Sequence, residues 1–210
     1  MEKIKLVVSM KGDKFKNKYR IKSTRLQNWD YSNNGYYFVT ICTKNKNKYF
    51  GEIKNKEMIL NDIGKIAEKC WLEIPKHFDF VVLDEFVIMP NHIHGIIIIN
   101  KNDISSLLPE TQNITSFTET QNIASLRRWP NKQNKFGVQS KNLASIIRGF
   151  KIGVTKYANQ NNITFRWQPR FYDRIIRTEI ELPNIREYIA FNPGKWQEDE
   201  NFVSELEEIL

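Results

Sequence analysis

The chain has 210 residues, of which 40% are hydrophobic and 12% aromatic, so it is long and apolar enough to bury the core of a folded domain. Its formal net charge of +8 favours a polyanionic partner, most often nucleic acid, although charge that serves only solubility is the alternative. The two cysteines are far apart, as in a reduced cytoplasmic protein rather than a disulfide scaffold, and no apolar run is long enough to cross a bilayer.

The first 30 residues are predicted to form a basic arm. Lysine and arginine recur through this segment with little apolar periodicity, which is typical of a segment that meets phosphate groups. Arg20 and Arg25 are the arginines of the arm that we expect to contact nucleic acid. A solvated tail without a binding role is the alternative interpretation.

Residues 31–196 are expected to form a single domain whose first half is rich in strands. Aromatic and β-branched residues predict extended segments at residues 36–43, 50–53, 57–60, 80–83 and 85–89, and then a strand that ends near residue 100. A helix is predicted over residues 63–74, where apolar residues recur at helical spacing after a cap at Asn61-Asp62. Pro75 ends or kinks this helix.

The second half of the domain begins with a change of composition. Residues 101–141 are polar and contain a duplication, because residues 110–114 recur as residues 119–123. Such a polar, duplicated stretch is expected to be a loop insertion.

Two helices and one more strand are predicted after the insertion. Apolar residues at helical spacing predict an amphipathic helix over residues 143–157, and residues 163–168 have the composition of a strand. A last helix opens at Leu182-Pro183 and is stopped by Pro193-Gly194. Residues 197–210 are expected to be an acidic C-terminal tail.

Two of the three histidines stand one residue apart inside an apolar run, as Asn91-His92-Ile93-His94. Because side chains alternate faces along a strand, His92 and His94 point to one face and Ile93 to the other. Two imidazoles in a hydrophobic strand are costly to bury unless something uses them. A divalent metal ion would use both, so the pair is a candidate metal site.

Tyr188 and Asn192 are four residues apart on the last predicted helix and therefore share a face. A tyrosine alone most often packs in a core or on a surface. A tyrosine one turn away from an amide, in a chain with a His-x-His strand, is instead a candidate catalytic residue.

These residues together suit the cleavage of a phosphodiester. His92, His94 and the amide oxygen of Asn192 would hold Mg²⁺ or Mn²⁺ with positions open for a phosphate oxygen, and imidazole suits Mn²⁺ better. The phenol of Tyr188 could attack phosphorus and form a phosphotyrosine link. Because this ligand set contains no carboxylate, we expect metal binding to be weak until DNA is present.

The segment Met89-Pro90-Asn91-His92-Ile93-His94-Gly95 resembles the His-hydrophobic-His motif of the HUH single-tyrosine transposases. More closely, the chain resembles the REP-associated tyrosine transposases. Other segments that carry the resemblance are residues 36–43, Phe150-Lys151, residues 167–177 and residues 188–196. The match runs from about Arg20 to Trp196 and leaves the insertion unmatched.

That resemblance implies an α+β fold, a ferredoxin-like or RRM-like sandwich with an antiparallel sheet and helices packed mainly on one face. It implies Tyr188 as the nucleophile and His92, His94 and Asn192 as the metal ligands. The implied activity is metal-dependent cleavage and strand transfer of single-stranded DNA next to a hairpin, through a 5′-phosphotyrosine, in DNA transposition or repeat-element processing. The implied setting is a monomer or homodimer in the bacterial cytoplasm, associated with the nucleoid when bound to DNA.

Basic residues in the second half of the domain are candidate contacts to the DNA backbone, where cations follow phosphates. They are Arg148, Lys151, Lys156, Arg170, Arg174 and Arg177.

Two other functions remain open. A binding module of the RRM type, without catalysis, would stack bases on its aromatic strand, but it needs neither the histidine pair nor the spacing of Tyr188 and Asn192. An HUH replication initiator or relaxase would use the same site, and would normally carry additional helicase or oligomerisation segments.

Overall fold

The computed structural model describes residues 14–15, 18–19, 26, 29–101 and 141–203. Arg20, Arg25, residues 102–140 of the predicted insertion and residues 204–210 of the predicted tail lie outside the described residues. Within the predicted arm, the strands β1 (Lys14–Phe15) and β2 (Lys18–Tyr19) pair in an antiparallel hairpin.

Four antiparallel strands form the central sheet in the order β6-β7-β3-β8. Their bounds are Gly35–Cys42 for β3, Val81–Ile88 for β6, His92–Ile99 for β7 and Tyr172–Ile176 for β8. Helix α1 (Asp62–Leu72) follows β3, and helix α4 (Leu143–Gln160) follows β7. The core elements therefore have the βαββαβ order of a ferredoxin-like fold, which confirms the predicted fold class.

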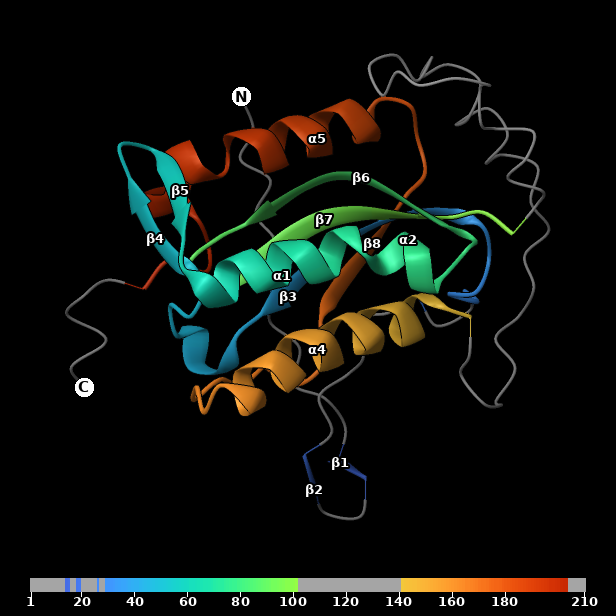
Figure 1. Cartoon of the computed structure of the whole chain (residues 1–210). Coiled ribbons are helices and arrows are strands. Elements are labelled where there is room, and N and C mark those ends of the chain that lie inside the picture. The colour runs from blue at the N-terminus through green and yellow to red at the C-terminus, as the bar shows by residue number, and fades with distance from the viewer. Residues whose placement is uncertain (1–13, 16–17, 20–25, 27–28, 102–140, 204–210) are drawn as a thin grey trace, which may run out of the picture.

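Smaller elements extend this frame. They are η1 (Lys44–Lys46), the hairpin strands β4 (Gly51–Lys54) and β5 (Glu57–Leu60), α2 (Ile74–His77), α5 (Glu181–Phe191) and η3 (Pro193–Glu198). Helices α1 and α4 lie on one side of the sheet, and α5 crosses the other side (Figure 1). None of the described helices combines the length and the apolar character that crossing a bilayer requires.

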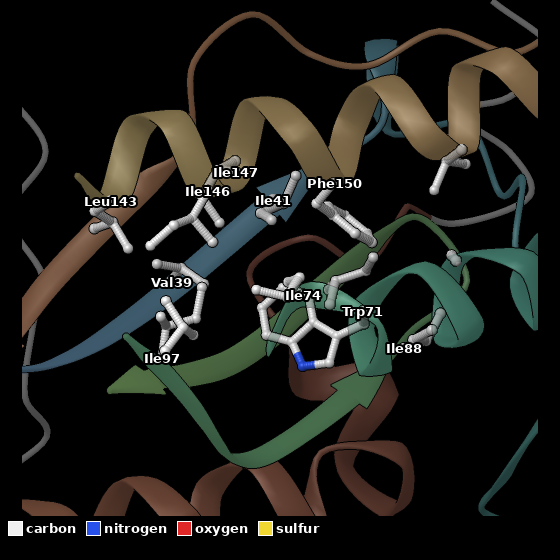
Figure 2. Close-up of a cluster of buried hydrophobic side chains, with 14 of the residues drawn as sticks. Val39, Ile41, Trp71, Ile74, Ile88, Ile97, Leu143, Ile146, Ile147 and Phe150 are labelled. Atoms are coloured by element: carbon white, nitrogen blue, oxygen red, sulfur yellow. The ribbon is translucent and has the colours of Figure 1, made fainter. Parts of the chain in front are cut away.

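The larger core fills the space between the sheet and helices α1 and α4. Val39 and Ile41 of β3 and Ile97 of β7 point to this side, where Trp71 of α1 and Phe150 of α4 pack on one another edge to face (Figure 2). Burial of these side chains removes apolar surface from water, which is the main favourable contribution to folding.

The opposite face of the same two strands carries a smaller core under α5. Tyr36 and Phe38 of β3 and Ile96 of β7 form a buried cluster with Leu182 and Ile189 of α5. Because β-strand side chains alternate, the residues beside this cluster along β7 also face α5. The two histidines of β7 therefore lie under α5, and they share one face of the strand, as their spacing predicts.

Gly95 allows the tight approach of α1 to the strand that carries the histidines. A Cβ atom at this position would lie 2.4 Å from Cζ2 of Trp71, closer than any real contact. The glycine thus lets the fully buried indole of Trp71 lie directly on β7, next to the histidine pair on the strand's other face.

Two local predictions need correction. The strand predicted at residues 163–168 is wrong, because within it only Trp167 makes a bridge, to Thr43, while the fourth strand of the sheet is β8. Phe165 and Trp167 pack on one another edge to face in the core, so their apolar character reflects packing rather than pairing in a β-ladder. The helix predicted over residues 63–74 is likewise not one continuous helix, because α1 ends at Leu72 and Pro75 lies in the first turn of the short helix α2.

Candidate active site

His92 and His94 lie side by side on the central strand β7 and are both buried. Their Nε2 atoms are 2.9 Å apart, and their rings meet edge to face with centroids 4.4 Å apart. Two imidazole nitrogens that converge in this way form one half of a metal site.

Asn91 determines which nitrogen of His92 is available. Its Nδ2 donates to the carbonyl oxygens of Lys46 (3.0 Å) and Asn201 (2.8 Å), which orients the amide. Oδ1 of Asn91 then faces Nδ1 of His92 at 2.8 Å, and because an amide oxygen only accepts, Nδ1 carries the hydrogen. A neutral imidazole with hydrogen on Nδ1 has its lone pair on Nε2, toward His94, as a metal ligand requires.

Thr40 supports His94 from the neighbouring strand. The register of β3 and β7 places Thr40 opposite His94, and its Oγ1 lies 2.9 Å from Nδ1 of the ring. Because a hydroxyl can donate or accept, Thr40 can hold either tautomer of His94. Phe38 stacks on the same ring with centroids 5.4 Å apart, which fixes the plane of the imidazole.

Burial keeps His92 uncharged at neutral pH. It lowers the pKa of His92 from 6.5 to about 3, and the neighbouring His94 lowers it further than burial alone would. A neutral imidazole is the form that binds a metal ion, so the site needs no proton release from His92 at neutral pH.

Helix α5 brings Tyr188 and Asn192 to the pair from above. The hydroxyl of Tyr188 lies 3.2 Å from Nε2 of His94, and the two rings are 5.2 Å apart. The side chain of Tyr188 is 47% exposed, so a large substrate can reach it, whereas Asn192 is buried. The two residues lie one turn apart on the face of α5 that meets the sheet, as their spacing predicts.

Asp199 is the residue of the site that the sequence did not reveal. It follows η3, and its side chain is 2% exposed, with carboxylate oxygens 3.9 Å from Nε2 of His92 and 3.8 Å from Nε2 of His94. Among the described residues, these three form the group whose ligand atoms lie within 4.8 Å of one another. The expectation of a site without a carboxylate is therefore wrong. Asp199 lay in the predicted acidic tail, and no periodicity distinguished it from the other carboxylates there.

The chain around Asp199 is held against the site by several contacts. Nζ of Lys46 donates to the carbonyl oxygen of Glu200 at 2.7 Å, and the backbone N–H of Asn201 donates to Oδ1 of Asp199 at 2.6 Å. The ring of Trp196 lies between His92 (6.0 Å) and Phe202 (5.3 Å). The first residues of the predicted tail are thus part of the site's wall.

The electrostatics of Asp199 and Tyr188 are coupled. Burial acts to raise the pKa of Asp199, but its interactions with His94, His92 and Asn192 outweigh this and hold the pKa well below the ordinary value of 3.8. Burial raises the pKa of Tyr188 well above its ordinary value of 10.0, and the Asp199 carboxylate raises it further. The carboxylate is therefore ionised and the phenol protonated at neutral pH.

Asn192 carries a buried oxygen that suits a cation. Its Nδ2 donates to Oδ2 of Asp199 at 3.1 Å, while its Oδ1 has no hydrogen-bond partner among the described residues. A buried acceptor without a partner is unfavourable, and a bound cation would satisfy it. Two imidazole nitrogens, an amide oxygen and a carboxylate oxygen are donors of the kind that bind a divalent cation.

The structure separates the predicted DNA contacts into two groups. Arg148, Lys151, Lys156 and Arg170 line a groove beside α4, on the other side of the sheet from Tyr188. Arg174, whose neighbour across the ladder is Phe38, lies on the edge strand β8 and forms an ion pair with Glu181. Arg177 is exposed just beyond the end of β8.

Comparison with known proteins begins with a close relative. The chain is 41% identical over 184 residues to an uncharacterized protein of Haemophilus influenzae, and the match covers 87% of this chain and 93% of that protein. The two chains belong to one family. No protein-family model matches the chain.

Two further matches concern REP-associated tyrosine transposases. The chain is 24% identical over 170 residues to the Haemophilus influenzae protein named "Putative REP-associated tyrosine transposase", covering 79% of this chain and 74% of that protein. A solved structure of a REP-associated tyrosine transposase bound to a REP hairpin matches 84% of this chain and 74% of its own chain, at 16% identity and a TM-score of 0.49. The sequence similarity confirms the resemblance that the motifs carry.

Proposed function

Starting from its similarity to the REP-associated tyrosine transposases, we propose that this chain is a metal-dependent endonuclease and strand transferase that acts on single-stranded DNA next to a hairpin. One observation carries the proposal: the hydroxyl of Tyr188 lies 3.2 Å from Nε2 of His94, which is itself 2.9 Å from Nε2 of His92. A nucleophile beside two converging metal-ligand nitrogens is the arrangement that phosphoryl transfer to a tyrosine needs.

Tyr188 supplies the attacking oxygen. Its Oη forms a bond to phosphorus while the bond from phosphorus to the 3′ oxygen breaks, which leaves a 3′ hydroxyl on one strand and a 5′-phosphotyrosine on the other. The phenolic proton must leave during the attack. With Nε2 of His94 (3.2 Å) assigned to the metal ion, Oδ2 of Asp199, 3.3 Å from the hydroxyl, would accept this proton, and the released 3′ oxygen would take a proton from water. A second 3′ hydroxyl can then attack the phosphotyrosine, with Tyr188 as the leaving group, so DNA rejoins without ATP.

The metal ion would be held by His92, His94, Asn192 Oδ1 and Asp199. When bound, Mg²⁺ or Mn²⁺ would neutralise charge on the non-bridging phosphate oxygens. Asn91 and Thr40 orient the imidazoles by holding their Nδ1 atoms.

The partner in this proposal is single-stranded or hairpin DNA, in processing of repeat elements or in transposition in the bacterial cytoplasm. Tyr188 and both histidines belong to the same chain, so one copy carries the nucleophile and the proposed ligands. A monomer is therefore sufficient for cleavage, with a homodimer as the alternative. The basic arm and the insertion are proposed as segments added to one catalytic domain, and the first residues of the acidic tail, with Asp199, as a part of that domain.

A covalent adduct tests the proposal directly. The native chain is incubated with labelled single-stranded DNA that flanks a hairpin, with Mn²⁺ or Mg²⁺, and the products are separated under denaturing conditions. We expect a labelled protein band that needs the metal. Tyr188→Phe should abolish the band and leave DNA binding unchanged, because the ring remains and only the nucleophile is lost.

Control variants separate this function from the alternatives. His92→Ala should also abolish the adduct, whereas Tyr172→Phe, a change of the same kind on β8, should leave it in place. An adduct that persists in Tyr188→Phe would rule out this nucleophile. DNA binding without any adduct in the native chain would favour the RRM-like binding module instead.

A further inference from the structure

A concave groove of about 670 Å³ lies beside α4, away from the histidine pair. One wall is a stripe of α4 residues that includes Arg148, Ile152 and Lys156, which recur at intervals of four and so lie on one side of the helix. The other wall is the turn that leads into β8 and carries Arg170 and Phe171. The groove therefore joins apolar and basic side chains from two separate segments.

The groove has an exposed apolar floor. Ile152 is 59% exposed, although large aliphatic side chains are usually buried, and Phe171 lies across from it. Asn159 adds an amide at the end of the same stripe, and none of the described residues that line the groove is acidic. A ligand with a negative backbone and a flat apolar surface would match this lining.

Lys151 acts as a support for the groove rather than as a free cation. Its Nζ donates to the carbonyl oxygens of Gln168 (2.9 Å) and Arg170 (2.6 Å) and lies 5.4 Å from the ring of Trp167. Trp167 Nε1 donates in turn to the carbonyl oxygen of Lys151 at 3.1 Å. These bonds hold the turn before β8 against α4, so Lys151 shapes the groove. The cations that can bind phosphate groups are then Arg148, Lys156 and Arg170.

Arg170 adds an independent observation. Its φ angle is 68°, in the left-handed region that glycine adopts readily and other residues adopt at a cost. The bond from Nζ of Lys151 to the carbonyl oxygen of Arg170 helps to hold this conformation, which places Arg170 in the wall of the groove.

We propose that this groove binds an unpaired nucleotide of the single-stranded DNA that the enzyme processes, with the base against Ile152 and Phe171 and the flanking phosphates on Arg148, Lys156 and Arg170. The inference rests on the proposed function for the identity of the DNA. A duplex presents its sugar-phosphate backbone outward and would leave the apolar floor uncovered, whereas an unpaired base offers a face that packs on apolar and aromatic side chains.

The path from the catalytic tyrosine to the groove runs around the edge of the sheet. Gln168 N–H donates to the carbonyl oxygen of Cys42 at 3.0 Å, and Cys42 is paired with His92 in the sheet. The turn that forms the groove wall therefore begins next to Cys42, at the end of β3 that is paired with His92. From there it continues into the edge strand β8. A DNA strand that passes Tyr188 can follow this edge into the groove.

Binding of a fluorescent oligothymidine of about 20 nucleotides to the full chain, measured by anisotropy in a chelator so that no cleavage occurs, tests the proposal. Ile152→Glu should weaken binding by about tenfold, because it places a negative charge on the floor against the phosphate backbone. Arg148→Ala with Lys156→Ala should weaken binding and reduce the slope of log affinity against log salt by roughly 0.7 per lost phosphate contact.

Arg170→Gly separates binding from folding. It removes a cation and relieves the left-handed backbone, so it should lower DNA affinity while the melting temperature is unchanged or raised. The matched controls are Ile59→Glu, an exposed isoleucine on β5, and Lys65→Ala, an exposed lysine on α1; both should bind oligothymidine like the native chain. With 5-iodouracil in the oligonucleotide, ultraviolet cross-linking should label the peptide that contains Phe171.

Each contrary result has a distinct meaning. Native affinity in the three groove variants, or an equal loss of affinity for a blunt duplex, would overturn the unpaired-nucleotide groove. If the native chain forms no phosphotyrosine adduct but the groove variants lose affinity for oligothymidine, the proposed function fails and the groove stands. If the adduct forms and the groove variants bind normally, only the groove is refuted.

Discussion

At the centre of the candidate site, one carboxylate faces a pair of imidazoles and a protonated phenol. Asp199 contacts both histidine nitrogens at under 4 Å and also lies within hydrogen-bond reach of Tyr188 and Asn192. Its negative charge should raise the affinity of the site for a divalent ion, since carboxylate oxygens are strong ligands for Mg²⁺ and Mn²⁺. In the absence of DNA, the site should therefore bind a metal ion more tightly than a ligand set without a carboxylate would.

Replacement of Asp199 by asparagine measures this contribution. The amide keeps the shape of the side chain but loses the charge, so we expect the dissociation constant for Mn²⁺ to rise by about tenfold or more. Isothermal titration calorimetry without DNA gives the value directly, free of any catalytic readout.

Glu200→Gln is the matched control, because it removes a neighbouring carboxylate whose contact to the site is made through its backbone oxygen. It should bind Mn²⁺ like the native chain. Equal Mn²⁺ affinity in Asp199→Asn and the native chain would exclude Asp199 from the ligand set.

At the level of elements, the position of α5 over the sheet decides where Tyr188 points. Nε of Arg186 donates to Oδ1 of Asp84 at 2.8 Å, and Nη2 donates to Oδ2 at 2.7 Å. The two hydrogen bonds form a bidentate ion pair between α5 and β6. Asp84 lies where the register of β6 shifts between Leu83 and Phe86. The irregularity in β6 thus presents a carboxylate to α5, the helix that carries the proposed nucleophile Tyr188.

A double-mutant cycle on this pair tests its role. Asp84→Ala and Arg186→Ala should show a coupling free energy of about 1–2 kcal/mol in urea unfolding, because the pair is largely shielded from water and bidentate. Each single variant should also slow formation of the phosphotyrosine adduct, since α5 loses its link to the sheet.

The exposed pair Glu52–Lys54 on the β4–β5 hairpin provides the control. Both of its side chains are more than half exposed, so its coupling should stay within about 0.5 kcal/mol. Coupling of similar size in both pairs would show that the Asp84–Arg186 bond does not hold α5.

For the whole molecule, the buried histidine makes stability depend on pH. His92 has a pKa of about 3 in the folded chain and an ordinary value of 6.5 when unfolded. Between pH 6.5 and pH 3, His92 of the unfolded chain binds a proton that His92 of the folded chain does not. The free energy of unfolding therefore decreases as the pH falls through this range. Above pH 6.5 the histidine causes no loss of stability. Asp199, whose pKa is lowered, loses its own stabilising contribution only at more acidic pH, below its ordinary value of 3.8.

We expect the histidine to account for a loss of about 2 kcal/mol between pH 7 and pH 5. Urea unfolding of the native chain and of His92→Asn, in the presence of a chelator, isolates this contribution as the difference between their pH profiles. His77→Asn replaces an exposed histidine and should retain the native profile. Parallel profiles for the native chain and His92→Asn would mean that His92 is not held neutral by the fold.

The sequence alone was sufficient for relations that depend on local geometry. His92 and His94 share a face because strand side chains alternate, and Tyr188 and Asn192 share a face because a helix turns every 3.6 residues. The ferredoxin-like fold class was implied by the motif resemblance, while the periodicities predicted individual helices and strands. The strand misplaced at residues 163–168 shows the limit, because packed aromatic residues and a short edge strand have similar apolar composition.

Only the tertiary structure decided which distant segments meet at the site. Asp199 follows the last helix and reaches the histidines because η3 turns the chain back, and turns of this kind leave no period in the sequence. The bond between Asp84 and Arg186 and the groove between α4 and the turn before β8 each join residues far apart in the chain. Their positions result from the packing of α4 and α5 on opposite faces of one sheet, which no local pattern specifies.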